Sequence, residues 1–170
     1  MSDSEGSGLT HAGSGLTHVD ETGAARMVDV SAKDVTARTA TATGRVLLSG
    51  EVVSLLRSGE VPKGDALGVA RIAGIMGAKR TPDLIPLCHP IALTGVKVTL
   101  DVEDWGVAIT CRAKTADRTG VEMEALTAVS VAALALIDMV KAVDPAAVIT
   151  DVRVEEKLGG KTGRWAREPE

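Results

Sequence analysis

The chain contains no Phe and no Tyr, and it has only two tryptophans, Trp105 and Trp165. A hydrophobic core must therefore be built from aliphatic side chains and Met, and such small side chains favour close packing of helices on a sheet. Cys88 and Cys111 are the only cysteines. Two are too few for a disulfide framework or for a metal site made of cysteine alone, so we interpret both as reduced thiols of a cytoplasmic protein.

The chain has no excess of positive charge, and it lacks several common catalytic and nucleotide-binding motifs. The formal net charge is -4, which argues against a broad nucleic-acid-binding surface and leaves any group of cations as a local feature. The sequence has no GxSxG motif, no Walker loop and no GxGxxG motif after a strand. These absences argue against hydride-transfer and kinase sites.

The length and composition indicate one folded domain with a tail at each end. With 170 residues and 45% hydrophobic content, the chain is long enough for a full core. Residues 1–15 are rich in Gly, Ser and Thr and lack the basic start and apolar run of a secretory signal, so we expect a disordered tail there. A single domain is predicted over residues 16–163, followed by a flexible tail at 164–170.

The longest helix-like stretch covers residues 120–144. Between Glu124 and Asp138 it has thirteen apolar or small residues, fewer than the roughly 20 that span a bilayer, so we expect no membrane span. Because the middle of this stretch is apolar on nearly every side, the helix should pack between two layers, its own sheet and a second subunit.

The two ends of this helix carry charged residues of different kinds. Glu122 and Glu124 lie in the first turn, where the helix dipole favours acids, whereas Asp138 and Lys141 lie near the last turn. An acid at the negative end of a helix, among apolar neighbours, is expected to keep its proton as a general acid does. The ordinary alternative, which the spacing alone favours, is an i,i+3 surface ion pair between Asp138 and Lys141.

Periodicity and helix-stop signals predict the other elements. The second helix, which starts at the cap residue Asp65, is expected to bury Leu67, Val69, Ile72, Ile75 and Met76. Residues 81–95 contain three prolines, so we expect a shaped loop rather than a regular helix or a central strand. Besides the helix at 120–144, the predicted elements are a strand at 35–46, helices at 45–58 and 65–79, a hairpin of strands at 96–102 and 107–113, and a last strand at 148–154 after Pro145.

This order of elements predicts an α+β fold. It is the ferredoxin-like split βαβ order with an extra helix, in which an antiparallel sheet is covered by helices on one face. The fold hosts many unrelated functions, so the chemistry must come from individual residues.

Several polar residues lie where local structure does not need them: Lys63, His89, Glu122, Glu124, Asp138, Lys141, Lys157 and Lys161. Taken singly, each has an ordinary explanation, such as a satisfied loop histidine, a solvated turn lysine or a basic tail. Taken together, the lysines, the histidine and the acids fit a site that binds a polyanion and moves protons. A zinc site at Cys88 and His89 lacks two further ligands at the usual spacing, so no metal site is predicted.

Seven motifs in the chain resemble those of the MoaC family of cyclic pyranopterin monophosphate synthases, which act in molybdenum cofactor biosynthesis. They are LTHVD at 16–20, MVDVSAK at 27–33, PKGDAL at 62–67, KRTPDLIPLCHPI at 79–91, RTGVEMEALTAVSVAAL at 118–134, IDMVKAVD at 137–144 and KLGGKTG at 157–163. The resemblance implies a phosphorus–oxygen lyase that converts a cyclic dihydroguanosine triphosphate, made by an upstream radical GTP cyclase, into cyclic pyranopterin monophosphate with loss of pyrophosphate. It also implies a ferredoxin-like homohexamer, a trimer of dimers with active sites between subunits.

The same resemblance implies roles for individual residues. The catalytic aspartate of the family matches Asp138, and its essential lysines match Lys63 and Lys141. The substrate-binding positions match Leu87, Cys88, His89, Glu122, Met123, Glu124 and Lys157. Ile137, Leu158 and Thr162 depart from the usual family residues, which leaves the setting of Lys157 open. No cofactor is required by the sequence, and it leaves open whether Mg²⁺ accompanies the substrate phosphates.

Two other functional classes remain on the sequence alone. A non-catalytic, phosphate-binding regulatory module could use the same fold, but Glu122, Glu124 and Asp138 would weaken its attraction for phosphate. A structural assembly protein would account for the apolar helix alone.

Overall fold

The computed structural model describes residues 23–161 and 163–168, so the expectation for residues 1–15 lies outside the described part of the chain. The element order is β1 (Thr36–Leu47), α1 (Gly50–Ser58), α2 (Ala66–Lys79), α3 (Thr81–Leu84), β2 (Leu93–Glu103), β3 (Gly106–Asp117), α4 (Glu122–Val140), β4 (Val148–Leu158) and β5 (Arg164–Ala166).

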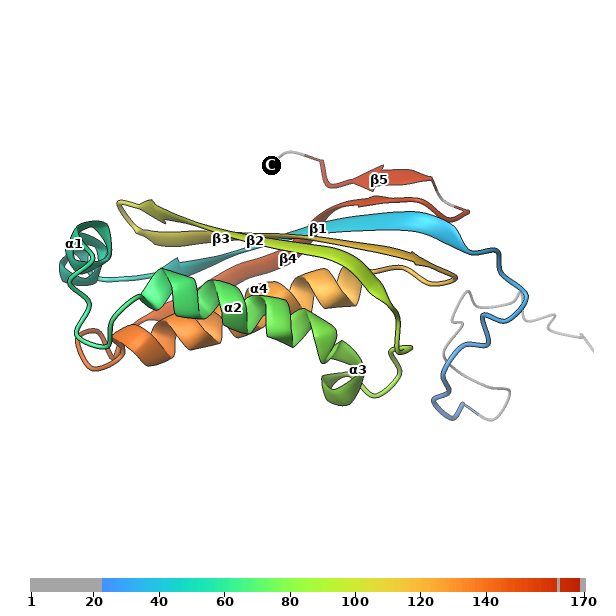
Figure 1. The fold of residues 1–170 in the computed structure, drawn as a ribbon, viewed down its shortest axis with the longest axis horizontal. Helices are drawn as coiled ribbons and strands as arrows, with labels where there is room; N and C mark the ends of the chain where they lie inside the picture. The colour runs from blue at the N-terminus through green and yellow to red at the C-terminus, as the bar shows by residue number, and fades with distance from the viewer. Residues whose placement is uncertain (1–22, 162, 169–170) are drawn as a thin grey trace, which may run out of the picture.

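The strands form one antiparallel sheet in the order β2-β3-β1-β4-β5. Strand β3 lies between β1 and β2, and β1 lies between β3 and β4, so each βαβ unit has another strand inserted into it. Helices α2 and α4 lie side by side on one face of the sheet (Figure 1). The predicted α+β, ferredoxin-like split βαβ fold with helices on one face is therefore confirmed.

The sheet has a strict two-residue pattern that separates its faces. On β1, Ala40, Ala42 and Val46 are buried under the helices, while the alternating residues between them are mostly Thr. Gly44 continues the buried row, and a Cβ atom there would lie 2.6 Å from Val129 Cγ1 of α4. These small residues let α4 lie directly on the sheet, and they offset the absence of large aromatic side chains.

Helix α2 contacts α4 through its smallest residues. A Cβ atom on Gly74 would lie 2.8 Å from the backbone oxygen of Ala128, and one on Gly77 would lie 2.8 Å from Val131 Cβ. The prediction for the buried side of α2 was therefore wrong for its larger residues: Val69, Ile72 and Met76 are 44%, 61% and 55% exposed, whereas Leu67 and Ile75 pack against the core. Because glycine and alanine bring the two helices together, the larger apolar side chains lie on the outer surface.

Several boundaries differ from the predicted ones for local reasons. Helix α1 begins at Gly50 rather than at residue 45, because β1 continues to Leu47 and Ser49 provides the N-cap. Asp65 caps α2 as predicted, with Gly68 N donating to its Oδ1 at 2.8 Å. The proline-rich segment is not entirely a loop: α3 forms a short helix with a proline in its first turn, where a missing N–H does no harm.

The C-terminal part is more ordered than its composition indicates. Strand β4 extends to Leu158 instead of ending at residue 154, and β5 forms at Arg164–Ala166, where we expected a flexible tail. Gly159 and Gly160 have φ of 97° and 72°, a conformation that glycine adopts readily, and they make the turn between the two strands. Lys157 consequently lies in a strand and not in a flexible basic segment.

Helix α4 has 19 residues and is, by length and composition alone, apolar enough to cross a membrane. Core helices of globular folds meet the same criteria, and half of the apolar window of α4 is buried here. The sheet covers one side of α4 and α2 lies beside it, whereas Leu134 is 59% exposed. The second covering layer predicted from the sequence is therefore not supplied by the described residues of this chain.

Candidate functional site

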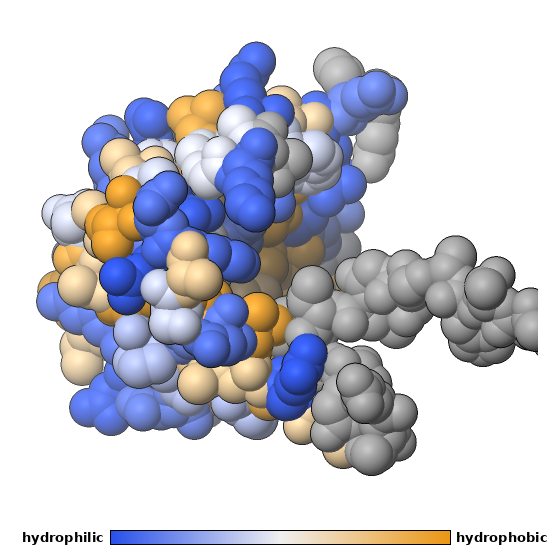
Figure 2. Space-filling model, turned by 90° about the vertical axis from the view of Figure 1, so that its right-hand side faces the viewer, coloured by the Kyte–Doolittle hydropathy of each residue, from blue (hydrophilic) through white to orange (hydrophobic). Residues whose placement is uncertain are grey.

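A cavity of about 540 Å³ lies where the loop after α3 meets the first turn of α4. Six of the predicted substrate-binding residues line it: Leu87, Cys88, His89, Glu122, Met123 and Glu124. Figure 2 shows this end of the molecule, where hydrophilic residues surround apolar ones. The volume lies in the range of small-molecule sites, which combine apolar walls with a few polar groups.

The loop of the cavity is held by hydrogen bonds at several points. Cys88 N donates to Ile85 O at 3.1 Å, and Thr115 Oγ1 of β3 donates to Ala92 O at 2.7 Å. His89 Nε2 lies 2.7 Å from Val28 O. Because a carbonyl oxygen only accepts, Nε2 carries the proton of this hydrogen bond, and Nδ1 is the ring nitrogen left for a ligand.

Glu124 is the buried acid of the cavity, with only 3% of its surface exposed. Burial raises the pKa of Glu124 to about 7, and the negative charge of Glu122 adds to this rise. Burial also raises the pKa of Cys88, and the charge of Glu124 adds to that effect. Cys88 is therefore a neutral thiol near pH 7, whereas Glu124 can gain or lose a proton there.

A second hollow of about 170 Å³ adjoins the cavity, and Gly120 and Glu122 line both. Its cations are Arg38, Lys157 and Lys161. Lys157 Nζ lies 3.2 Å from Glu122 Oε1, which ties β4 to the first turn of α4. Lysine and arginine at this position suit the phosphates of a ligand whose ring occupies the larger cavity.

The remaining predicted residues form a group at the other end of α4. Lys141 Nζ lies 2.7 Å from Asp138 Oδ1, and Lys63 Nζ lies 3.5 Å from Asp138 Oδ2. Lys63 also donates to the backbone oxygen of Asp138 at 2.6 Å. The predicted surface pair of Asp138 and Lys141 is thus present, and Lys63 extends it to a triad.

The expectation that Asp138 keeps its proton was wrong. The hydrogen bond and charge of Lys141, followed by the charge of Lys63, lower the pKa of Asp138. The side chain of Asp138 is 59% exposed, so its desolvation raises the pKa less than the two lysines lower it. Asp138 is a carboxylate held between two ammonium groups and is not suited to be a general acid.

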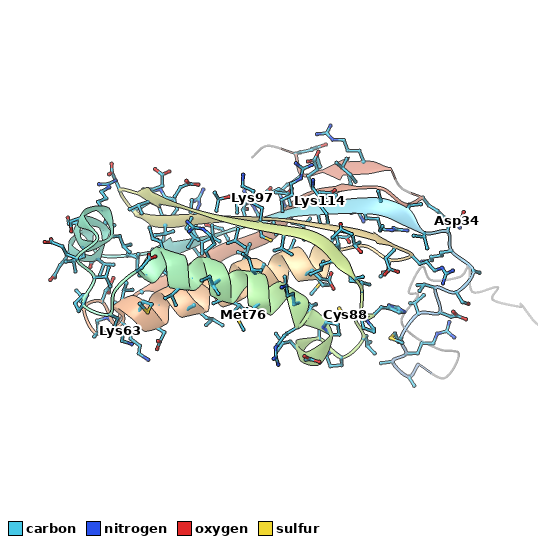
Figure 3. The ribbon with its side chains drawn as sticks, in the orientation of Figure 1. Asp34, Lys63, Met76, Cys88, Lys97 and Lys114 are labelled. Atoms are coloured by element: carbon cyan, nitrogen blue, oxygen red, sulfur yellow. The ribbon has the colours of Figure 1, made fainter. Side chains whose placement is uncertain are left out.

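The structure does not bring the two groups together within one chain. Glu124 and Asp138 are fourteen residues apart on α4, which places them about 21 Å apart along the helix axis. Cys88 and Lys63 accordingly lie toward opposite ends of the helix layer (Figure 3). One small ligand cannot contact both groups of the same subunit.

Sequence reasoning missed some residues that line the site. Lys33, Val28 and Val30 line the large cavity, and Arg38 lines the adjoining hollow. Arg38 also donates through Nε to Asp117 O at 3.0 Å and so fixes the turn before α4. An arginine among Thr and Ala near the start of β1 was the available signal, but only the strand pairing shows that it lies beside the turn before α4.

Within the part of the chain that the structure describes, no group of three or more His, Cys, Asp or Glu could hold a metal ion.

The fold and these two residue groups define a class: a small α+β protein with a nucleotide-sized cavity, titratable groups in its wall and cations beside it. The chain belongs to the MoaC family, whose model matches residues 27–160. It is 75% identical over 152 residues to the cyclic pyranopterin monophosphate synthase of Streptomyces avermitilis, covering 89% of each chain. It is 73% identical over 152 residues to the protein of the same name from Streptomyces coelicolor, again covering 89% of each. A relative named cyclic pyranopterin monophosphate synthase 2, from Mycobacterium tuberculosis, is 60% identical over 152 residues and covers 89% of this chain and 91% of its own.

Proposed function

We propose that this chain is a lyase that converts a cyclic dihydroguanosine triphosphate into cyclic pyranopterin monophosphate and releases pyrophosphate, an early step of molybdenum cofactor biosynthesis. Membership of the MoaC family and the names of relatives that match along nine-tenths of the chain support this reaction. The upstream radical GTP cyclase would supply the substrate, and the protein would work in the cytoplasm.

The observation that carries the proposal is the cavity beside α4 with its adjoining cationic hollow. A nucleotide-derived substrate needs room for a ring system and cations for its phosphates. His89 and Glu124 supply polar groups in the larger cavity, and Arg38 and Lys157 supply positive charge next to it. These residues support binding of the ring in the cavity and of phosphates toward the hollow.

Catalysis by both groups requires that subunits share a site. In a two-fold dimer, two antiparallel copies of α4 would place the Asp138 end of one subunit at the Glu124 end of the other. The exposed apolar residues Val69, Ile72 and Met76 of α2 and Leu134 of α4 support a contact between the helix layers of two subunits. Three such dimers form the proposed homohexamer.

The chemistry assigns a separate task to each group. Closing the cyclic phosphate forms a P–O bond between a substrate hydroxyl and the innermost phosphorus, and it breaks the P–O bond to the outer two phosphates, which leave as pyrophosphate. Lys63 and Lys141 would stabilise the charge on the phosphates, and Asp138 would orient both ammonium groups and accept a proton. Ring opening and reclosure need proton transfer, for which Glu124, with its pKa of about 7, is suited.

Mg²⁺ has a place in this scheme only on the substrate phosphates, which are strong oxygen ligands for it. The described residues offer no cluster of side chains that would hold the ion on the protein itself. Residues on the protein side of the phosphates are lysine and arginine, which carry the same kind of charge as the ion.

The non-catalytic regulatory module is not favoured. Glu122 and Glu124 lie in the wall of the cavity, and their negative charge reduces the affinity for a phosphate ligand without benefit to a pure binding protein.

The direct test is to supply purified protein with the cyclic dihydroguanosine triphosphate and to measure pyrophosphate and the cyclic monophosphate product. We expect both to form in equal amounts, and Lys141→Ala to form neither. Folded wild-type protein that binds the substrate but releases no pyrophosphate would overturn the proposal in favour of a binding role.

A further inference from the structure

The face of the sheet opposite α2 and α4 carries three cations near its β2 edge, which we call the outer cation cluster: Lys97, Arg112 and Lys114. Lys97 pairs directly with Arg112 in the β2–β3 register, and Lys114 follows two residues later on β3. Directly paired residues, and residues two apart on one strand, share a face of the sheet. Figure 3 shows Lys97 and Lys114 on the side away from the two helices.

A hollow of about 320 Å³ lies among these side chains. The cluster lines it together with Thr94, Gly95 and Val96, so every charged residue in its wall is a cation. Gly95 has no side chain to fill the space, and a Cβ atom there would lie 3.9 Å from Lys114 Cδ. The hollow therefore has a floor of backbone and small residues and a wall of positive charge, and it shares no residue with the cavity at α4.

The three cations have no partner for their charge among the described residues. No side-chain hydrogen bond or ion pair within residues 23–161 and 163–168 involves Lys97, Arg112 or Lys114. On the adjacent strand β1, the residues paired with Arg112 and Lys114 are Thr41 and Thr39, which are neutral. The neighbouring strand thus supplies hydroxyl groups but no negative charge.

The acids on the same face do not neutralise the cluster. The carboxylate of Glu155, which accepts from Thr43 Oγ1 of β1 at 2.6 Å, forms ion pairs with Arg153 and Arg167. Glu156 lies on β4, where it pairs with Thr41 of β1. Its carboxylate accepts a hydrogen bond from Arg164 Nε at 2.7 Å. Asp101 lies four residues from Lys97 on β2, about 13 Å along the strand. That separation exceeds the screening length of about 8 Å at physiological ionic strength, so Asp101 contributes little.

An unneutralised cluster of this kind is unfavourable by itself. Like charges directly opposite each other on adjacent strands destabilise a sheet, and here the pair is Lys97 and Arg112. The surplus of positive charge is local, because the whole chain has a formal net charge of -4. An anion bound between the three side chains would offset their mutual repulsion, because each cation would be attracted to the anion.

We propose that the outer cation cluster binds a compact polyanion of the phosphate class, best represented by a diphosphate. Cross-strand neighbours are about 5 Å apart and residues two apart on a strand are about 7 Å apart, so the three cations surround a space suited to two joined phosphate groups. Arg112 can hold one phosphate with two parallel hydrogen bonds, and the two lysines act as mobile point charges. The site is independent of the reaction proposed above.

Protection of lysines from acetylation tests the proposal at the level of single residues. The wild-type protein is treated with an acetylating reagent in the presence of increasing inorganic pyrophosphate, and the modified lysines are quantified by mass spectrometry. We expect pyrophosphate to slow acetylation of Lys97 and Lys114 at least about threefold relative to Lys79, an exposed lysine at the end of α2. Orthophosphate should protect less at equal concentration, and added salt should weaken the protection.

A substitution that keeps both lysines makes the test sharper. Arg112→Gln should raise the pyrophosphate concentration needed for half-protection about two- to fivefold, the loss typical of one exposed charge pair. Arg57→Gln removes one cation from an exposed ion pair with Asp104 on a different part of the surface, and it should change nothing at Lys97 and Lys114. Neither residue lies in the cavity or in the lysine triad, so both variants should keep wild-type turnover.

Three results would overturn the proposal. One is acetylation of Lys97 and Lys114 that stays as fast as that of Lys79 at saturating pyrophosphate. Another is equal protection in the wild type and in Arg112→Gln. The third is that both lysines are unreactive without pyrophosphate, because that face would then be covered by another molecule and not open to a small anion.

Discussion

The two ends of α4 carry acids in opposite electrostatic situations. Glu124, in the first turn, is 3% exposed, and burial raises its pKa to about 7. Asp138, in the last turn, has a side chain that is 59% exposed, and Lys141 and Lys63 lower its pKa. Both are carboxylic acids on one helix, yet near neutral pH the resting protein holds Glu124 partly protonated and Asp138 ionised.

This difference shows that helix position alone does not set the behaviour of an acid. The helix dipole favours a charged acid at the first turn and disfavours one at the last, which is the reverse of what is found. Burial overrides the dipole at Glu124, and two ammonium groups override it at Asp138. The buried end therefore suits proton transfer and the exposed end suits the organisation of positive charge.

The largest expected effect concerns the exposed end. Asp138→Asn and Lys141→Ala should each lower turnover by about 1,000-fold, because each removes part of the charge arrangement around the phosphates. The melting temperature should stay close to that of the wild type, since exposed ion pairs contribute little to stability. Turnover is measured by pyrophosphate release and stability by thermal unfolding.

A matched control for this end is Asp104→Asn. Asp104 also forms an exposed ion pair at 2.7 Å, with Arg57, but lies outside both residue groups. It should keep wild-type turnover. If Asp138→Asn behaved like Asp104→Asn, the triad would be only a surface ion-pair network and the contrast between the two ends would have no catalytic meaning.

The next effect tests whether the two ends meet across subunits. Glu124→Gln and Asp138→Asn are mixed in equal amounts under conditions that allow subunit exchange. About half of the dimers would then be mixed, and each mixed dimer would have one site with both lesions and one with neither, so about a quarter of wild-type activity should return. Each variant exchanged with itself is the control. Activity no higher than in those controls, with exchange verified by mass spectrometry, would rule out the shared site.

The third effect concerns stability and pH at the buried end. The pKa of Glu124 rises from 4.5 to about 7 on folding, so the folded state binds more protons in that interval. The contribution of Glu124 to the free energy of unfolding is therefore fully present below pH 4.5. As the pH rises through about 7, this contribution is lost, and the free energy of unfolding falls by on the order of 3 kcal/mol. Glu124→Gln should remove this loss.

The measurement is the melting temperature of wild type and variant at pH 5 and pH 8. We expect Glu124→Gln to be stabilised relative to the wild type at pH 8 and to differ less at pH 5. Glu51→Gln, an exposed glutamate on α1, should give the same difference from wild type at both values. A parallel pH dependence in wild type and Glu124→Gln would mean that Glu124 is ionised in the fold and that the two ends are alike.

The smallest effect separates two neighbours in the cavity loop. His89→Ala should weaken substrate binding about tenfold, because it removes a ring that donates to Val28 O and lines the cavity. Cys88→Ser should lose less than about threefold, because burial keeps the thiol protonated and a hydroxyl occupies similar space. Both are measured as KM and kcat for pyrophosphate release. Equal and large losses would indicate a thiol or metal role at Cys88.

Much of the fold could be predicted because its strands and helices follow simple periodicity. The alternation along β1, β2 and β3 and the cap at Asp65 led directly to the observed architecture. The face of α2 could not be predicted in the same way. Its apolar stripe is genuine, but Gly74 and Gly77 let α4 come so close that the small residues make the contact and Ile72 and Met76 are left outside.

The candidate site was predicted in its residue types but not in its geometry. The sequence places Glu122, Glu124 and Asp138 on one helix, and helix rise alone gives the separation of about 21 Å between Glu124 and Asp138. It does not give the exposure of Asp138, which depends on packing, so the predicted direction of its pKa was wrong. Arg38 was missed because its place beside the turn before α4 results from pairing between distant strands.

The absence of Phe and Tyr leaves the ultraviolet emission of the protein to two indole rings. Trp105 lies in the β2–β3 turn with Arg45 5.3 Å from its ring centre, whereas Trp165 lies on β5 directly opposite Lys157. Since Lys157 lines the cationic hollow, an anion that enters there changes the surroundings of Trp165 but not those of Trp105. Replacing Trp105 by a non-fluorescent residue would leave a protein whose own fluorescence reports on the filling of that hollow without any attached dye.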